Sequence, residues 1–309
     1  MNNDIDKTVK LADDSTYANI FSYMGLPLSR DLERVGLDAV VMGIPYDLGT
    51  SGRAGARSGP NGIRQASANL RWEEQRWPWS FSLNERLQAI DYGDVQFASG
   101  DSDDMLAQVE AHAARITAAG KTLISLGGDH FVTLPLLRGH VAAHGKLALI
   151  HFDAHTDTYA QHEKYDHGSM FYRAPREGLI DTERSIQIGI RTDYDWQEHE
   201  FQVINADQVN EQLVDETVAA IRARVGDAPA YLTFDIDALD PAFAPGTGTP
   251  VVGGLSTSRA LRILRGLADL NIVGFDVMEV SPAYDQSQLT ALAGASLALE
   301  FLYMRASRT

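Results

Sequence analysis

Short apolar runs recur along the chain and alternate with longer stretches of helical periodicity. Most of these runs are continuously apolar, which is typical of parallel strands covered by helices on both faces. The pattern predicts strands at 37–44, 87–92, 122–126, 146–152, 185–190, 230–234 and 271–277.

Helix-like stretches lie between these runs. The clearest covers 102–119, where Asp101 or Ser102 can cap the first turn and Gly120 ends the pattern. Further helices are expected to begin near Thr257 and near Ser287. Alternating strands and helices form βαβ units, so the pattern predicts an α/β fold on a mainly parallel sheet.

No repeat, low-complexity tract or long linker divides the chain of 309 residues. We therefore predict a single catalytic domain over 1–309, with 1–36 as an N-terminal extension packed on the domain or on a neighbouring subunit. Two loops are unusual, because 47–64 is crowded with glycine and 240–255 with glycine and proline. Such loops either shape a ligand site or form tight surface turns, and both interpretations stay open.

The composition limits which catalytic groups, metal ligands and partners the chain can have. The chain has no cysteine, which excludes disulfides and thiol catalysis and leaves imidazole and carboxylate groups as metal ligands. A formal net charge of −16 disfavours nucleic acid and anionic membranes as partners and favours a cationic ligand. No apolar run is long enough to span a membrane, and the polar N-terminus lacks signal-peptide features, so a cytoplasmic location is expected.

Metal-ligand side chains follow four of the predicted strands. The strand at 122–126 leads into G-G-D-H, with Asp129 and His130, and the strand at 271–277 leads to Glu279. The other two segments are D-A-H-T-D and D-I-D, which contain Asp153, His155, Asp157, Asp235 and Asp237. Parallel strands all point the same way, so these segments should meet at the sheet edge where open α/β sheets bind ligands.

Side chains two residues apart share a face of an extended segment. The two aspartate-rich segments should therefore direct five ligand groups the same way. His151 is expected to point off that face and to be a core residue, or one that contacts the ligands, rather than a ligand itself.

The four aspartates of these two segments carry four negative charges, and burying them is prohibitive unless they are protonated, paired or metal-bound. Two divalent cations would balance the charge. Two ions that share carboxylates also keep a position open for water, whereas one ion with six protein ligands does not. We therefore predict a binuclear site for Mn²⁺, Fe²⁺, Co²⁺ or Zn²⁺.

Taken together, the motifs resemble those of the ureohydrolases, the family of the arginases and agmatinases. The resemblance rests on G-G-D-H, D-A-H-T-D and T-F-D-I-D-A-L-D-P, with S-G-R-A-G-A-R-S-G-P-N-G-I-R upstream and G-T-G-T-P-V-V-G-G-L downstream. The segments D-H-G-S-M-F-Y and E-V-S-P-A-Y-D-Q-S are most similar to those of bacterial agmatinases. This resemblance implies a three-layer α/β/α sandwich around a mainly parallel eight-stranded sheet, assembled as trimers or hexamers.

The resemblance also implies roles for individual residues. Two Mn²⁺ ions would be held, the first by His130, Asp153, Asp157 and Asp235, and the second by Asp153, His155, Asp235 and Asp237. Asp153 and Asp235 would bridge them. His167 matches a mobile-loop histidine that shuttles protons, and Glu279 matches the carboxylate that pairs with the substrate guanidinium.

The activity implied by the resemblance is that of an agmatinase, a hydrolase of linear amidine C–N bonds in polyamine biosynthesis. A hydroxide that bridges the metals would attack agmatine and release urea and putrescine. Arginases hold the α-carboxylate and α-amine of arginine with a Ser-Gly-Asn tract, which is missing from the loop after D-A-H-T-D. The missing tract favours agmatine as the substrate. His162 and Glu163 in the same loop are expected to be solvated rather than to bind metal.

Three alternatives stay open. A guanidinobutyrase would require a cation at the pocket rim, for which Arg53 or Arg173 is available. A metallophosphoesterase can use the same ligands, but no motif supplies a cationic phosphate clamp. A non-catalytic binding protein of the same fold would be expected to have lost ligands, and all six are present.

Overall fold

In the computed structural model of the protein, which describes residues 21–73, 75–160 and 164–308, eight parallel strands form one sheet. The strand order is β2-β1-β3-β8-β7-β4-β5-β6. The strands are β1 (Leu37–Gly43), β2 (Gln88–Asp94), β3 (Thr122–Leu126), β4 (Ala148–Phe152), β5 (Ile186–Ile190), β6 (Gln202–Asn205), β7 (Ala230–Asp235) and β8 (Ile272–Met278).

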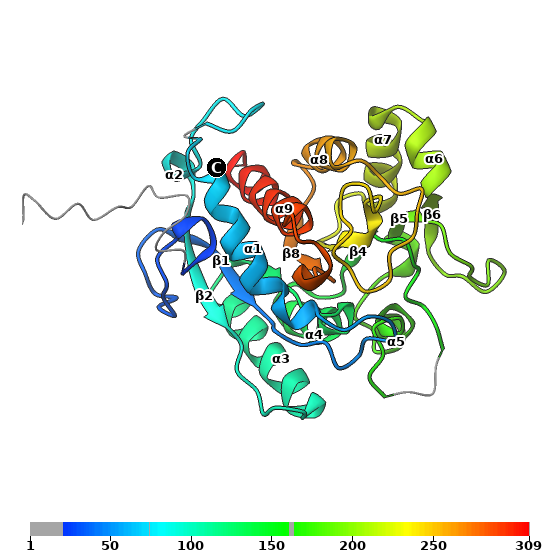
Figure 1. The fold of residues 1–309 in the computed structure, drawn as a ribbon, viewed down its shortest axis with the longest axis horizontal. Coiled ribbons are helices and arrows are strands. Elements are labelled where there is room, and N and C mark those ends of the chain that lie inside the picture. The colour runs from blue at the N-terminus through cyan, green and yellow to red at the C-terminus, as the bar shows by residue number, and fades with distance from the viewer. Residues whose placement is uncertain (1–20, 74, 161–163, 309) are drawn as a thin grey trace, which may run out of the picture.

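Helices cover both faces of the sheet, as Figure 1 shows. One face packs against α3 (Ser102–Ala118), α4 (Thr133–His144) and α5 (Met170–Arg176). The other packs against α1 (Gly59–Ser67), α2 (Leu83–Arg86), α6 (Ala206–Glu211), α7 (Val214–Val225), α8 (Thr257–Gly266) and α9 (Leu289–Ala306). Side chains along β1 alternate between the two cores, with Val41 in one and Val40 in the other. The predicted three-layer α/β/α sandwich is therefore confirmed.

The seven predicted strands are all present, but the sequence pattern missed β6. This strand lies at the sheet edge and only Ile204 in it is buried, so it lacks an apolar run. The prediction of α3 is confirmed in detail, because the Asp101 side chain accepts a hydrogen bond from the backbone N–H of Asp104 at 3.0 Å. Gly120 follows the helix with a left-handed φ of +71°.

The glycine-rich segment 47–64 is not a loop throughout, because its last third, residues 59–64, forms the start of α1. Gly59 opens this helix where the chain passes close to the backbone. A Cβ atom there would lie 2.6 Å from the carbonyl oxygen of Val280 and 2.8 Å from that of Gly127. Glycine is therefore required by close packing at this point rather than by a flexible turn.

The described part of the predicted N-terminal extension, residues 21–36, packs on this chain. The Tyr23 hydroxyl donates to the carbonyl oxygen of Ala295 at 2.7 Å, and the Tyr23 N–H donates to Asp91 at 2.7 Å. The rest of the extension, residues 1–20, lies outside the described residues.

Helix α9 is buried along most of its length, but no described helix combines the length and apolar character needed to cross a membrane. It carries one fully buried carboxylate, Glu300. Arg265 of α8 donates to both oxygens of this carboxylate, at 2.8 and 3.0 Å, and the Trp79 indole N–H donates to it at 2.7 Å. The ion pair links α8 to α9 on their shared face of the sheet.

Replacing Arg265 with methionine is expected to lower the free energy of unfolding by about 3 kcal/mol, because it leaves a buried charge without its main partner. Arg262→Met serves as the control, since Arg262 is exposed on the same helix. Denaturant unfolding followed by circular dichroism measures both variants. Equal stability of the two would show that the Glu300 ion pair does not stabilise the fold.

Candidate metal centre

The strands that precede the predicted ligands are neighbours in the middle of the sheet. β3, β8, β7 and β4 are consecutive in the strand order, although they are far apart in the sequence. The chain leaves them at the same edge and there places His130, Glu279, Asp235 and Asp153. The predicted convergence of the four segments at one edge is confirmed.

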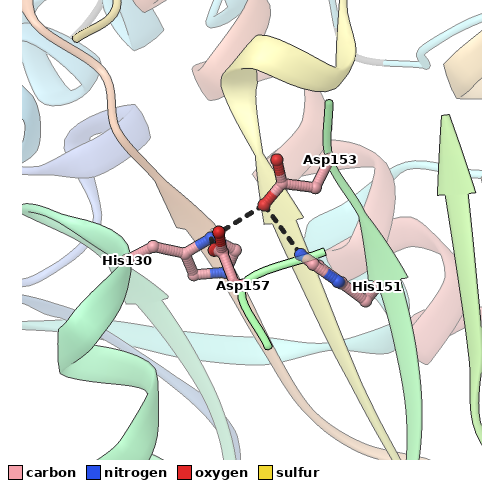
Figure 2. A group of neighbouring side chains, drawn as sticks. All are labelled: His130, His151, Asp153 and Asp157. Carbon is pink, nitrogen blue, oxygen red and sulfur yellow. Dashed lines mark hydrogen bonds and ion pairs between the residues drawn. The ribbon is translucent and has the colours of Figure 1, made fainter. Parts of the chain in front are cut away.

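His130 faces three carboxylates in a buried space. Its Nδ1 atom lies 3.2 Å from Asp153 Oδ2, 3.1 Å from Asp157 Oδ2 and 3.2 Å from Asp235 Oδ2. Figure 2 shows His130 converging with Asp153 and Asp157, which both come from the segment after β4. This Nδ1 atom is buried and has no hydrogen-bond partner of acceptable geometry. An imidazole nitrogen and three carboxylate oxygens that converge in this way fit a divalent cation.

A second group adjoins the first. His155 Nδ1 lies 3.3 Å from Asp153 Oδ1 and 3.1 Å from Asp237 Oδ2. Asp153 therefore directs Oδ2 toward His130 and Oδ1 toward His155. Asp235 directs only Oδ2 toward the first group, because its Oδ1 accepts from the N–H of Asp237 at 2.8 Å. The structure brings all six predicted ligands together, with Asp153 between the two groups.

The protonation equilibria show how much negative charge is concentrated here. Burial and, to a smaller extent, the charge of Asp153 raise the pKa of Asp157 to about 7. Burial also raises the pKa of Asp235 well above its usual range, as does the charge of Asp237. Burial alone would lower the pKa of His155, but hydrogen bonds to Asp153 and Asp237 raise it to about 12. The centre binds positive charge strongly, and divalent cations would displace these protons.

The expectation that His151 points away from this face is wrong. Residues 151 and 153 are two apart, so they share a face of the strand, and His151 Nε2 lies 2.8 Å from Asp153 Oδ2 (Figure 2). The Gln187 amide nitrogen lies 2.7 Å from the carbonyl oxygen of Thr156 and 2.9 Å from His151 Nδ1. Because a carbonyl oxygen only accepts, this amide must donate to both atoms. His151 is thus protonated at Nε2, through which it donates to Asp153.

Burial lowers the pKa of His151 to about 4, consistent with a neutral ring that holds Asp153 in place. Asp129, which precedes His130 in G-G-D-H, faces elsewhere. It accepts from the N–H of Gly49 at 2.7 Å and from the N–H of Phe131 at 3.2 Å. Asp129 therefore anchors the 47–64 segment beside the centre.

Glu279 adjoins His130 and has a strained backbone, with a left-handed φ of +63°. Its Oε1 accepts from the N–H of His130 at 2.9 Å and lies 2.7 Å from His167 Nδ1. Its Oε2 is buried and has no hydrogen-bond partner among the described residues. One carboxylate oxygen is therefore held by the protein, and the other keeps an unused acceptor.

The second nitrogen of His167 is held by the 47–64 segment. His167 Nε2 accepts from the Ser51 N–H at 3.1 Å and lies 2.7 Å from the Ser51 hydroxyl. Burial alone would lower the pKa of His167, but the hydrogen bond and charge of Glu279 raise it to about 9. Cations bound to the aspartates would weaken the smaller contribution from Asp157. The Glu279 contact therefore favours protonation of the ring, but the hydrogen bond from the Ser51 N–H requires a lone pair on Nε2, so these contacts are those of a neutral His167 with its proton on Nδ1.

Part of the centre, together with His167 and Ser51, borders a cavity of about 150 Å³. The lining residues are Ser51, His155, Asp157, Tyr159, Asp166, His167, Gly168, Asp235 and Thr249. Ser51 and Thr249 come from the two glycine-rich segments, which shows that both segments shape this site. The sequence reasoning missed Tyr159 and Asp166, although Asp166 directly precedes His167.

No lysine or arginine belongs to the described lining of this cavity. Arg53 donates to the Thr247 carbonyl oxygen at 2.8 Å and lies over the Tyr284 ring. Arg173 lies over the Phe131 ring. Neither candidate cation therefore lines the cavity. His162 and Glu163 lie outside the described residues.

Comparisons with known proteins agree with this arrangement. A family model described as the arginase family matches residues 37–304. An agmatinase from Photorhabdus laumondii is 57% identical over 96% of both chains. A solved structure of a hypothetical agmatinase from Burkholderia thailandensis is 47% identical with a TM-score of 0.91, covering 95% of this chain and 93% of that one. Proclavaminate amidino hydrolase from Streptomyces clavuligerus is 38% identical with a TM-score of 0.89, covering 96% and 100%. The chain belongs to the arginase family.

Proposed function

We propose that the protein hydrolyses agmatine to putrescine and urea at a centre of two Mn²⁺ ions. The observation that carries this proposal is the cavity beside His155 and Asp157, which has carboxylates and no cation in its described lining. Relatives named agmatinase, 56–57% identical over 96% of the chain, support the same activity.

The proposed ligands are the two groups described above. His130, Asp153, Asp157 and Asp235 would hold one ion. Asp153, His155 and Asp237 would hold the other. The resemblance implies Asp235 as a further ligand of this second ion, although its Oδ1 here accepts from the Asp237 N–H. Oxygen and imidazole donors without thiolates suit Mn²⁺. When bound, the metal pair lowers the pKa of water toward neutrality and so supplies a hydroxide nucleophile.

Glu279 would bind and orient the guanidinium group. Its Oε1 is held by His130 and His167, so the free Oε2 can accept an N–H of the substrate in a fixed direction. A charge-assisted hydrogen bond of this kind is stronger than a neutral one. Since the carboxylate is already positioned, little ordering is required when the substrate binds.

His167 would deliver a proton to the departing amine. The guanidinium carbon is a poor electrophile, and its C–N bond breaks only if the amine leaves in protonated form. Although burial alone would lower the pKa of His167, the Glu279 contact raises it to about 9. Once Nε2 is released from the Ser51 N–H it can therefore take up a proton and act as the general acid. Ser51 holds the ring from its other side.

The charge of the cavity selects the substrate. Agmatine is a dication. Of the carboxylates that line the cavity, Asp157 and Asp235 would be neutralised by the metal ions, which leaves Asp166 as the lining carboxylate available to a cationic group. Arginine and 4-guanidinobutyrate each carry a carboxylate, which requires a cation that the described lining lacks. We therefore propose agmatine as the preferred substrate, ahead of a guanidinobutyrase activity.

A urea-release assay with Mn²⁺-loaded protein tests the proposal across agmatine, arginine, 4-guanidinobutyrate, 3-guanidinopropionate and a set of phosphoesters. We expect urea and putrescine from agmatine, with kcat/KM at least about 100-fold above that for the carboxylated substrates, because a buried carboxylate without a partner is costly. Comparable rates on arginine or 4-guanidinobutyrate would contradict the substrate assignment. Phosphoester turnover, or no turnover at all, would favour the alternatives of a phosphoesterase or a binding protein.

The trimeric or hexameric assembly and the cytoplasmic location stay predictions. Analytical ultracentrifugation of the purified protein tests the first of them.

A further inference from the structure

We propose that Thr233 and Asp276 are positioning residues, which fix the His130 ring so that Nδ1 faces the metal centre. The proposal rests on the proposed role of His130 as a ligand. Thr233 and Asp276 have no role in the chemistry described above, and neither lines the cavity.

The three side chains form a buried chain of hydrogen bonds. His130 Nε2 lies 2.8 Å from Thr233 Oγ1, and Thr233 Oγ1 lies 2.6 Å from Asp276 Oδ1. All three residues are 0% exposed. Thr233 on β7 and Asp276 on β8 are direct partners in the register of the sheet, so the backbone holds this contact in place.

The hydrogen-bond directions follow from the chemistry of the groups. Asp276 is surrounded by hydroxyls, because its Oδ2 also accepts from the hydroxyls of Tyr231 at 2.8 Å and Thr133 at 2.9 Å. A carboxylate accepts only, so the Thr233 hydroxyl donates to Asp276 and its oxygen is left to accept from His130. The His130 ring then carries its proton on Nε2.

This tautomer leaves a lone pair on Nδ1. It is the same atom that is buried, lacks a hydrogen-bond partner and faces Asp153, Asp157 and Asp235. A hydrogen bond to the far nitrogen fixes both the tautomer and the orientation of a metal-binding imidazole. Without the hydroxyl of Thr233, the ring would be free to rotate or to place its proton on the metal side.

A purely structural role for Asp276 is the competing explanation. A carboxylate in the middle of a sheet is costly to bury, and apolar residues of similar size usually stabilise such positions as well or better. Asp276 does join β7 to α4 through Tyr231 and Thr133. The two threonines separate these explanations, since both hydroxyls donate to Asp276 and both residues are fully buried, but only the Thr233 hydroxyl contacts the His130 ring.

The experiment compares Thr233→Val with Thr133→Val, each of which removes one hydroxyl from Asp276 without changing side-chain shape. Mn²⁺ affinity of the metal-free full-length protein is measured by titration calorimetry, together with the rise in melting temperature that Mn²⁺ produces. We expect Thr233→Val to weaken Mn²⁺ binding about 10–100-fold, as losses of such supporting contacts typically do. Thr133→Val should change it less than about threefold, because valine keeps the backbone N–H that Thr133 donates to the His130 carbonyl oxygen and the lost hydroxyl does not contact the His130 ring.

Thr233→Ser keeps the hydroxyl, and it should restore affinity close to that of the unmodified protein. Equal affinities for the two valine variants, whether both normal or both reduced, would overturn the proposal. If Thr233→Val does not fold, Asp276→Asn is compared with Thr233→Ser instead. The proposal then requires that Asp276→Asn weakens Mn²⁺ binding and that Thr233→Ser does not. These measurements use no substrate, so a protein that binds Mn²⁺ but does not hydrolyse agmatine would contradict the proposed function alone.

Discussion

Replacing Asp153 with asparagine is expected to leave about one metal ion or fewer per chain and to abolish turnover of agmatine. Asp153 is the one carboxylate that faces both groups, with Oδ2 toward His130 and Oδ1 toward His155. The amide keeps the shape but removes the charge, and its NH₂ group cannot bind a cation. Two ions that share a bridging ligand lose part of both sites at once. Elemental analysis and a urea-release assay measure the two consequences.

Asp227→Asn is the control for this substitution, since its side chain is 97% exposed and pairs only with Arg184 at the surface. The control should keep full metal content and activity. Two metal ions per chain in the Asp153→Asn protein would contradict the shared-carboxylate centre. Unchanged activity with one ion would show that a single metal is sufficient.

Replacing His167 with alanine is expected to lower kcat on agmatine about 10²–10⁴-fold while both metal ions stay bound, because this residue would supply general acid catalysis. His167 contacts Glu279 and Ser51 rather than the six proposed ligands. Its loss should therefore affect proton delivery and leave metal affinity near normal. Steady-state kinetics with parallel elemental analysis measures both.

His144→Ala is the control for this substitution, because His144 is exposed. It should change neither kcat nor the metal content. Normal kcat in the His167→Ala protein would remove this residue from the mechanism. A loss of metal from that protein would show instead that His167 supports the centre itself.

The buried elements of the fold could be predicted from the sequence because parallel strands covered on both faces produce continuous apolar runs. The edge strand β6 produces no such run, so the pattern missed it. The helical part of the 47–64 segment, residues 59–64, was hidden by its glycines, of which Gly59 is required by close packing. Neither feature has a local signal, since both depend on which segments lie nearby.

The six candidate ligands could be located because they directly follow strands that point the same way. The order of those strands was not readable from the sequence, and the supporting contacts depend on it. Thr233 meets Asp276 only because β7 pairs with β8. Gln187 reaches His151 only because β5 lies beside β4. The error on His151 was of another kind, because the two-residue spacing that relates Asp153 to His155 applies equally to His151.

The location of metal in crystals of the Mn²⁺-loaded protein tests the two-metal centre most directly, by anomalous scattering at the manganese edge. The account predicts two peaks per chain. One should contact His130 and Asp157, the other His155 and Asp237, and both should contact Asp153. A single peak, or a peak bonded to His151 Nε2 in place of Asp153, would contradict it.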